Sequence, residues 1–156
     1  MANKVKEKTK DKTKVKEKET PKEKENYIGK VYPSYFVYYN AKQKKERIKS
    51  RPVLIIAEPI GKKDTEYTVL PISTVSRTEF HNEDYDVKLT AKKLTKAKFD
   101  QDCYVKTQKR TTIYKSNIDF KKCIVDLKKE YPGIYGNILK RMTLFDQMIV
   151  KEAKKK

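Results

Sequence analysis

The chain has 156 residues, the length of one domain, and carries 39 Lys and Arg against 21 Asp and Glu, a net charge of +18. This charge indicates a polyanionic or acidic partner, with RNA, DNA and an anionic membrane surface all open on charge alone. No run of 18 apolar residues and no apolar signal-peptide core is present, so we expect a cytoplasmic protein without a membrane span.

The first 26 residues form a low-complexity segment of Lys, Glu, Thr and Asp that contributes +4 of the charge. Its sizeable apolar residues are Met1, Val5 and Val15, too few to offset the entropy lost on ordering. We therefore predict a disordered tail over 1–26, a folded domain over 27–150 and a frayed basic end over 151–156. The other +14 lies in residues 27–156, so the positive charge belongs to the domain and not only to the tail.

The first half of the domain is rich in strand-forming residues. Residues 27–39 are mostly aromatic or β-branched, which predicts one strand, or two short strands broken at Pro33. Residues 40–50 are polar and basic without a hydrophobic period, which predicts a long exposed loop. Residues 53–57 and 67–72 are short apolar runs, typical of buried strands.

Shorter strands and one helix are expected in the second half. A strand is predicted over 86–90, and 102–106 and 111–114 fit two more strands or one bent strand. Residues 120–127 fit a last strand or the start of a helix. From Tyr131 the apolar residues fall on one helical face, at positions 131, 134, 135, 138, 139, 142 and 145. The predicted fold class is mainly β with a C-terminal helix (α+β), a small barrel-like sheet capped by that helix.

Several catalytic classes lack the residues that they need. None of the four glycines has a Walker or dinucleotide-binding spacing, and no Gly-x-Ser-x-Gly elbow is present. His81 is the only histidine, so an acid–base ribonuclease with two histidines is excluded, and its polar surroundings favour a surface role. Glu83, Asp84 and Asp86 could bind magnesium, although a solvated loop fits them better. Cys103 and Cys123 could form one disulfide in a secreted protein, but reduced cytosolic thiols fit them better. With one histidine and two isolated cysteines we expect no zinc site, and we expect no cofactor.

The remaining candidates for catalysis are arginine, lysine and hydroxyl side chains, which occur in three segments. Arg51 precedes the apolar run 52–57, although an arginine at the mouth of a strand is by itself more often a surface residue. The next strand ends in two hydroxyl residues, Ser73 and Thr74, which also fit an ordinary strand exit. Residues 106–112 hold three cations, an amide and three hydroxyls, which suits phosphates and base edges, or equally a solvated basic edge.

Taken together, the segments resemble the MazF/PemK family of toxins from type II toxin–antitoxin systems, over about residues 28–148. The matching motifs, in family order, are Gly29-Lys30-Val31-Tyr32, Arg51-Pro52-Val53-Leu54-Ile55-Ile56, Pro71-Ile72-Ser73-Thr74 and Gln108-Lys109-Arg110-Thr111. The resemblance implies an SH3-like barrel of the CcdB/MazF/PemK type, usually a homodimer, that cleaves single-stranded RNA at short, specific sequences without a metal. The implied products carry a 2′,3′-cyclic phosphate and a 5′-hydroxyl.

The resemblance also implies roles for single residues. Arg51 would stabilise the phosphorane, because a guanidinium keeps its charge and can hold two oxygens, and it could protonate the leaving 5′-oxygen. The family's catalytic threonine corresponds to Ser73, with Thr74 beside it. The residues expected to bind RNA are Lys44, Lys45 and Arg47 in the mobile loop, and Lys106, Gln108, Arg110 and Thr111.

This chain departs from the family in having Ser73 at the threonine position and a basic loop without glycine. The family's partner is an antitoxin with an acidic C-terminal segment, which the net +14 of residues 27–156 would attract. Two other functions stay open: a non-catalytic nucleic-acid-binding barrel, and a gyrase poison of the same fold. The Arg51 and Gln108-x-Arg110 matches argue against the gyrase poison.

Overall fold

The computed structural model describes residues 25–74 and 81–156. The predicted tail over 1–26 lies almost wholly outside the described residues. The elements are β1 (Lys30–Asn40), β2 (Lys45–Ala57), β3 (Glu66–Ser73), β4 (Asp86–Leu89), β5 (Cys103–Lys106), η2 (Thr107–Lys109), β6 (Thr111–Tyr114), η3 (Lys115–Asn117), β7 (Val125–Asp126), α1 (Leu127–Glu130) and α2 (Pro132–Ala153).

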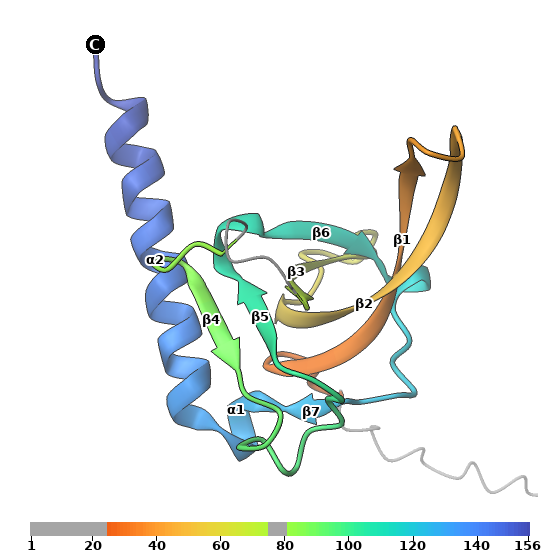
Figure 1. The fold of residues 1–156 in the computed structure, drawn as a ribbon. Coiled ribbons are helices and arrows are strands. Elements are labelled where there is room, and N and C mark those ends of the chain that lie inside the picture. Colours follow the sequence, from red (N-terminus) through yellow and green to blue (C-terminus); the bar gives the residue numbers. More distant parts are fainter. Residues whose placement is uncertain (1–24, 75–80) are drawn as a thin grey trace, which may run out of the picture.

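In the described part of the chain, seven antiparallel strands form one sheet in the order β4-β5-β3-β2-β1-β7, and β6 pairs with β3 off this path. The sheet curls into a partial barrel, and α2 stands against its β4–β5 side (Figure 1). The predicted class, mainly β with a C-terminal helix on a barrel-like sheet, is confirmed. None of the described helices is long and apolar enough to cross a membrane.

The loop predicted over 40–50 is wrong, because most of this segment is β-strand. β1 and β2 pair from Val31↔Leu54 to Asn40↔Lys45, so only a short turn separates them. In that turn Lys44 has a positive φ of 49°. The hairpin projects away from the body of the sheet (Figure 1), so neither of its faces is buried enough to impose a hydrophobic period.

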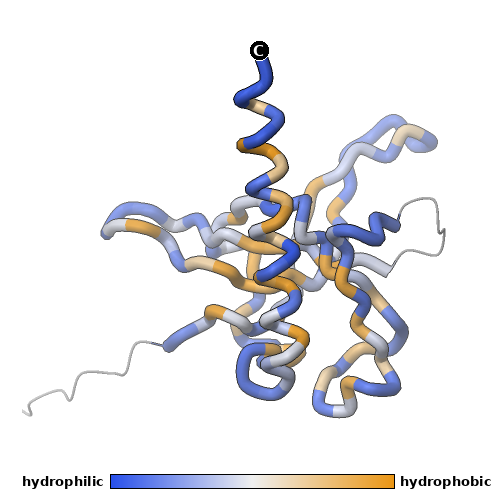
Figure 2. Tube along the Cα trace, turned by 90° about the vertical axis from the view of Figure 1, so that its left-hand side faces the viewer, coloured by the Kyte–Doolittle hydropathy of each residue, from blue (hydrophilic) through white to orange (hydrophobic). Residues whose placement is uncertain are grey.

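The C-terminal helix is longer than predicted. Pro132 stands at its start, where a missing backbone N–H costs nothing, and the helix ends at Ala153. It thus runs three residues into the end that we expected to be frayed. Its lower turns bury Tyr135 and Ile138, and its last turns rise beyond the sheet (Figures 1 and 2).

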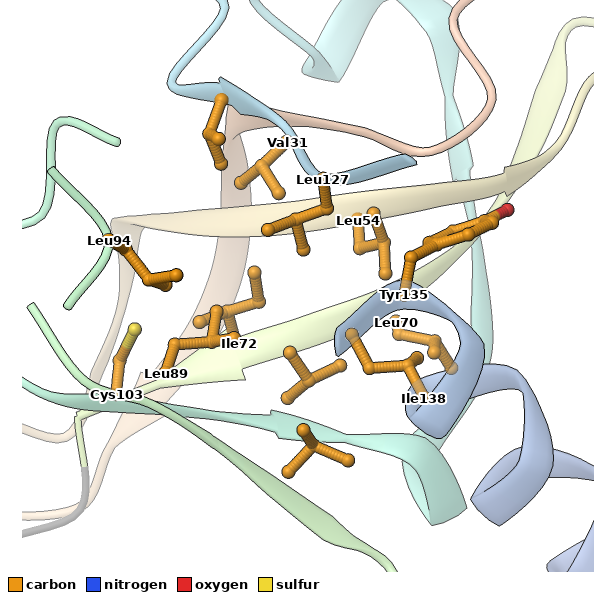
Figure 3. Close-up of a cluster of buried hydrophobic side chains, with 13 residues drawn as sticks. Val31, Leu54, Leu70, Ile72, Leu89, Leu94, Cys103, Leu127, Tyr135 and Ile138 are labelled. Carbon is orange, nitrogen blue, oxygen red and sulfur yellow. The ribbon is translucent and has the colours of Figure 1, made fainter. Parts of the chain in front are cut away.

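Two apolar clusters lie on opposite faces of the strands. The larger cluster packs Leu54, Leu70 and Leu89 of the sheet against Tyr135 and Ile138 of α2 (Figure 3). Each such side chain contributes about 1.5–3 kcal/mol when fully buried. The smaller cluster lies on the other face, built from Tyr32, Val53, Ile55, Tyr67, Val69, Ile113 and Ile118.

Gly29 allows β1 to meet α1 closely. Its φ is +86°, and a Cβ at this position would lie 2.4 Å from the Cβ of Lys128. A larger residue would have both a strained backbone and a clash. The glycine of the first motif is therefore required by packing.

Candidate functional site

A pocket of about 560 Å³ lies between residues 49–52 of β2, residues 72–74 at the end of β3, and residues 98–101. Arg51, Ser73 and Thr74 all line it. Arg51 and Thr74 are exposed and Ser73 is half-buried. The three residues predicted to be catalytic are thus brought to one surface, although Arg51 lies on a different strand from the hydroxyls.

The strand pairing explains why these residues meet. The β2–β3 ladder ends at the pair of Val53 and Pro71, and Arg51 and Ser73 each lie two residues beyond this pair on their strands. Side chains two residues apart point to the same face of a strand. The Ser34 hydroxyl on β1 donates to the carbonyl oxygen of Arg51 at 2.7 Å and helps to hold the end of this ladder.

A row of paired residues runs from Ser73 across the sheet. Ser73 pairs with Tyr104 of β5, and Tyr104 pairs with Lys88 of β4. Ser73, Tyr104 and Lys88 therefore form one cross-strand row, here called the site row, and Ser73 shares the pocket with Arg51. Neighbouring strands lie about 4.8 Å apart, so the row from Ser73 to Lys88 spans roughly 10 Å.

The pocket is strongly cationic. Lys49, Arg51, Lys98 and Lys109 line it, against one carboxylate, Asp100, among its described lining residues. Such a surface favours a polyanion. Sequence reasoning missed Lys98 and Asp100, which lie in the segment between β4 and β5, although the lysines at 92, 93, 96 and 98 were a signal there.

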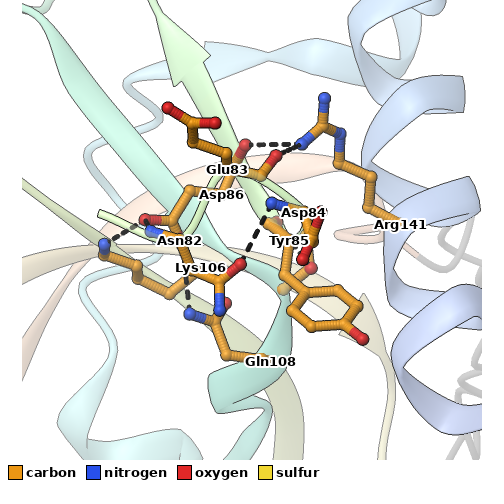
Figure 4. A network of polar contacts seen from close by, with 9 residues as sticks. Asn82, Glu83, Asp84, Tyr85, Asp86, Lys106, Gln108 and Arg141 are labelled. Carbon is orange, nitrogen blue, oxygen red and sulfur yellow. Dashed lines mark hydrogen bonds and ion pairs between the residues drawn. The ribbon is translucent and has the colours of Figure 1, made fainter. Parts of the chain in front are cut away.

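Lys106 differs from the exposed cation that the sequence led us to expect. Its side chain is 5% exposed, and its ammonium donates to the carboxylate of Asp86, which is 3% exposed (Figure 4). Asp86 also accepts from the backbone N–H of Asn82 at 2.9 Å and from Gln108 Nε2 at 3.1 Å. Lys106 lines the pocket, but its charge is compensated by this buried partner.

Gln108, Arg110 and Thr111 do not line the pocket in the described structure. Gln108 belongs to the Asp86 network, and its Oε1 is buried with no partner among the described atoms. Arg110 forms a two-pronged ion pair with Asp146 of α2, with both N–O distances at 3.0 Å. Thr111 is exposed on β6, opposite Val69. Their contacts with RNA stay a prediction.

Lys44, Lys45 and Arg47 lie on the β1–β2 hairpin, beyond the pocket. Lys45, Arg47, Lys49 and Arg51 alternate along β2, so they share one face of the hairpin. Phe36 and Tyr38 of β1 stand on this face, opposite Lys49 and Arg47. The hairpin therefore carries a cationic ladder that leads to Arg51.

Both cysteines are free thiols, as expected. Cys103 lines the pocket but is buried, and burial raises the pKa of its thiol to about 12. It is therefore protonated at neutral pH and unsuited to act as a nucleophile. Cys123 is exposed.

A sequence model of the PemK-like, MazF-like toxins of type II toxin–antitoxin systems matches residues 34–131, which is well over half of the chain. The chain belongs to this family. The matched span runs from β1 through α1 and includes every residue that we expected to be catalytic.

The fold agrees with the family. The Mycobacterium tuberculosis toxin MazF-mt6 superposes with a TM-score of 0.50 and 16% sequence identity, over 76% of this chain and 96% of that toxin. No curated protein matches the chain significantly. MazF/PemK toxins are known as endoribonucleases, and a type II toxin has an antitoxin as its partner.

Proposed function

We propose that this protein is a metal-independent endoribonuclease toxin that cleaves single-stranded RNA, mRNA above all, in the cytoplasm and so inhibits translation. The observation that carries the proposal is the meeting of Arg51, Ser73 and Thr74 in one cationic pocket. These groups can hold a phosphate and stabilise the charge that it gains during cleavage.

The proposed reaction is attack of a ribose 2′-oxygen on the adjacent phosphorus. The new P–O2′ bond forms as the P–O5′ bond breaks, which leaves a 2′,3′-cyclic phosphate and a 5′-hydroxyl. The guanidinium of Arg51 donates to two phosphorane oxygens, and the hydroxyl of Ser73 or Thr74 donates to the same charge.

Two protons must also move. Asp100 is the candidate acceptor for the 2′-hydroxyl proton, because it is the carboxylate among the described residues of the pocket. Arginine does not give up its proton, so we assign Arg51 an electrostatic role. The leaving 5′-oxygen then takes its proton from solvent at the open pocket, in place of the proton transfer from Arg51 considered above.

The cationic surface also supports the proposed partners. An acidic antitoxin segment would compete with RNA for the pocket and the hairpin ladder, and complementary charge would speed its association. We further propose a homodimer, as the family implies. On the hairpin face opposite the ladder, Val37 and Tyr39 are 65% and 64% exposed, and this apolar surface fits a protein contact.

The deciding experiment incubates the purified full chain with single-stranded RNA in EDTA and maps the 5′-hydroxyl ends. Arg51→Ala should lower cleavage by about 100-fold or more while the fold is kept. Lys62→Ala, in the β2–β3 turn, is the control for loss of one surface charge. Cleavage that needs magnesium, or that survives loss of Arg51, would contradict the mechanism.

Two outcomes would support other functions. Salt-dependent RNA binding without cleavage would indicate a non-catalytic binding barrel. Trapped double-strand breaks in DNA would indicate a gyrase poison.

A further inference from the structure

A second, smaller pocket of about 300 Å³ lies beside the site row, on the far side of Tyr104 from Ser73. His81, Asn82, Glu83, Asp86, Lys88 and Tyr104 line it. Because Tyr104 pairs directly with Ser73, its Cα lies roughly 5 Å from that of the serine. A nucleotide next to the cleaved phosphate would reach this pocket.

Two flat rings form one wall of the pocket. The rings of His81 and Tyr104 have centroids 4.1 Å apart and are tilted by 40°. Lys106 Nζ lies 5.7 Å from the Tyr104 centroid, and its bond to Asp86 fixes it there. Both rings are half-buried, so part of each ring stays accessible to solvent. Unstacked RNA bases bind proteins by stacking on such rings.

The charges of the pocket do not favour a phosphate. Asp86 is paired with Lys106, and Lys88 is paired with Asp102 at 3.3 Å. The carboxylate of Glu83 would repel an anion, unlike the lysine-rich pocket around Arg51. A metal ion is also disfavoured, because the Asp86 carboxylate already accepts from Lys106, Asn82 and Gln108. An uncharged, flat ligand with polar edges fits best, since Asn82, Glu83 and Lys88 offer an amide, an acceptor and a donor.

We propose that this pocket binds one nucleobase of the RNA next to the cleaved phosphate, and that His81 and Tyr104 hold it by stacking. The inference rests on the proposed ribonuclease function. It assigns binding roles to His81, which the sequence indicated to be an ordinary surface residue, and to Tyr104. Preference for one base would arise from the polar edge, while the rings supply affinity.

The chain itself supplies a reporter, because His81 is its only histidine and gives a single imidazole signal in NMR spectra. The full chain is titrated with single-stranded RNA whose riboses are 2′-O-methylated, so that no attack occurs. We expect the His81 signal to shift as a base stacks on the ring. An abasic oligonucleotide of equal length, added to equal occupancy of the protein, should leave the signal nearly unmoved.

Variants give a second measurement. His81→Ala should weaken binding of the methylated RNA by about five-fold or more, the loss expected for one stacked base. His81→Phe keeps a flat ring and should restore most of the affinity. Thermal melting of both variants checks that the fold is kept.

The outcomes separate this inference from the proposed function. An equal shift with the abasic strand, or unchanged affinity in His81→Ala, would overturn the base-binding pocket. RNA cleavage without any shift of the His81 signal would contradict the base-binding role of the pocket but support the nuclease function. A base-dependent shift in a protein that does not cleave RNA would support the pocket but contradict the nuclease function.

Discussion

The ammonium of Lys106 donates to the carboxylate of Asp86 across the β4–β5 ladder, and both side chains are almost fully buried. Arg141 of α2 donates to the backbone carbonyl of Asp86 at 3.1 Å (Figure 4). Asp86 therefore connects β4 and β5, next to the site row, to the C-terminal helix. Lys106 is a structural residue, although its segment was expected to bind RNA.

Removing the carboxylate of this pair should destabilise the fold strongly. Asp86→Ala leaves the Lys106 charge buried without compensation, which costs about 3–5 kcal/mol. The double variant Asp86→Leu/Lys106→Met should recover much of the loss. Urea unfolding measures the stability of the single and the double variant. The control is Lys155→Ala, which breaks an exposed ion pair with Glu152 and should change the free energy of unfolding by less than about 0.5 kcal/mol. A small loss for Asp86→Ala would contradict the buried pair.

The two hydroxyl residues of the pocket should contribute unequally to catalysis. Ser73 is the last residue of β3 and is half-buried in the pocket that Arg51 lines, whereas Thr74 is exposed, so Ser73→Ala should lower kcat by about 100-fold and Thr74→Ala by much less. Ser73→Thr keeps the hydroxyl and should stay active. Single-turnover cleavage of one RNA measures all three. The reverse order would assign the role to Thr74.

The hairpin ladder should add salt-dependent affinity for RNA. For a single strand, each phosphate that a cationic side chain neutralises adds about 0.7 to the slope of log Kobs against log salt. We expect Arg47→Ala and Lys45→Ala each to reduce the slope by about this amount in binding titrations between roughly 50 and 200 mM salt. Lys62→Ala should leave the slope unchanged, and an unchanged slope in the hairpin variants would exclude the ladder from binding.

The two cysteines should differ sharply in reactivity. Burial raises the pKa of Cys103 to about 12, so below that pH its thiol stays protonated in the native state and reacts slowly. Iodoacetamide near pH 8 should therefore add one carbamidomethyl group to the folded protein, at exposed Cys123, and two such groups to the denatured protein. Mass spectrometry counts the carbamidomethyl groups. Rapid addition of two groups to the native protein would show that β5 opens easily.

The role of Arg110 can be separated from its ion pair with Asp146. The pair is about 40% exposed on both sides, so breaking it should cost less than about 1 kcal/mol. If Arg110 acts only by fixing α2, the exchange Arg110→Asp/Asp146→Arg should restore RNA cleavage that Arg110→Ala has lowered. If Arg110 contacts RNA, as the family motif implies, the exchanged protein should stay impaired.

The sequence by itself determined the fold class, most strand positions and the family, because half-buried strands and an amphipathic helix leave periodic patterns. The hairpin was missed for the same reason: both of its faces are exposed, so residues 40–50 carry no such pattern. The family resemblance grouped Arg51 with Ser73, but only the tertiary structure decided that Lys98 and Asp100 line the same pocket and that Gln108 and Arg110 do not. The register places Arg51 near Ser73 and Ser73 beside Tyr104, and it buries Lys106 on Asp86, twenty residues earlier in the chain. Pairing between distant strands sets these contacts, and local composition does not encode it.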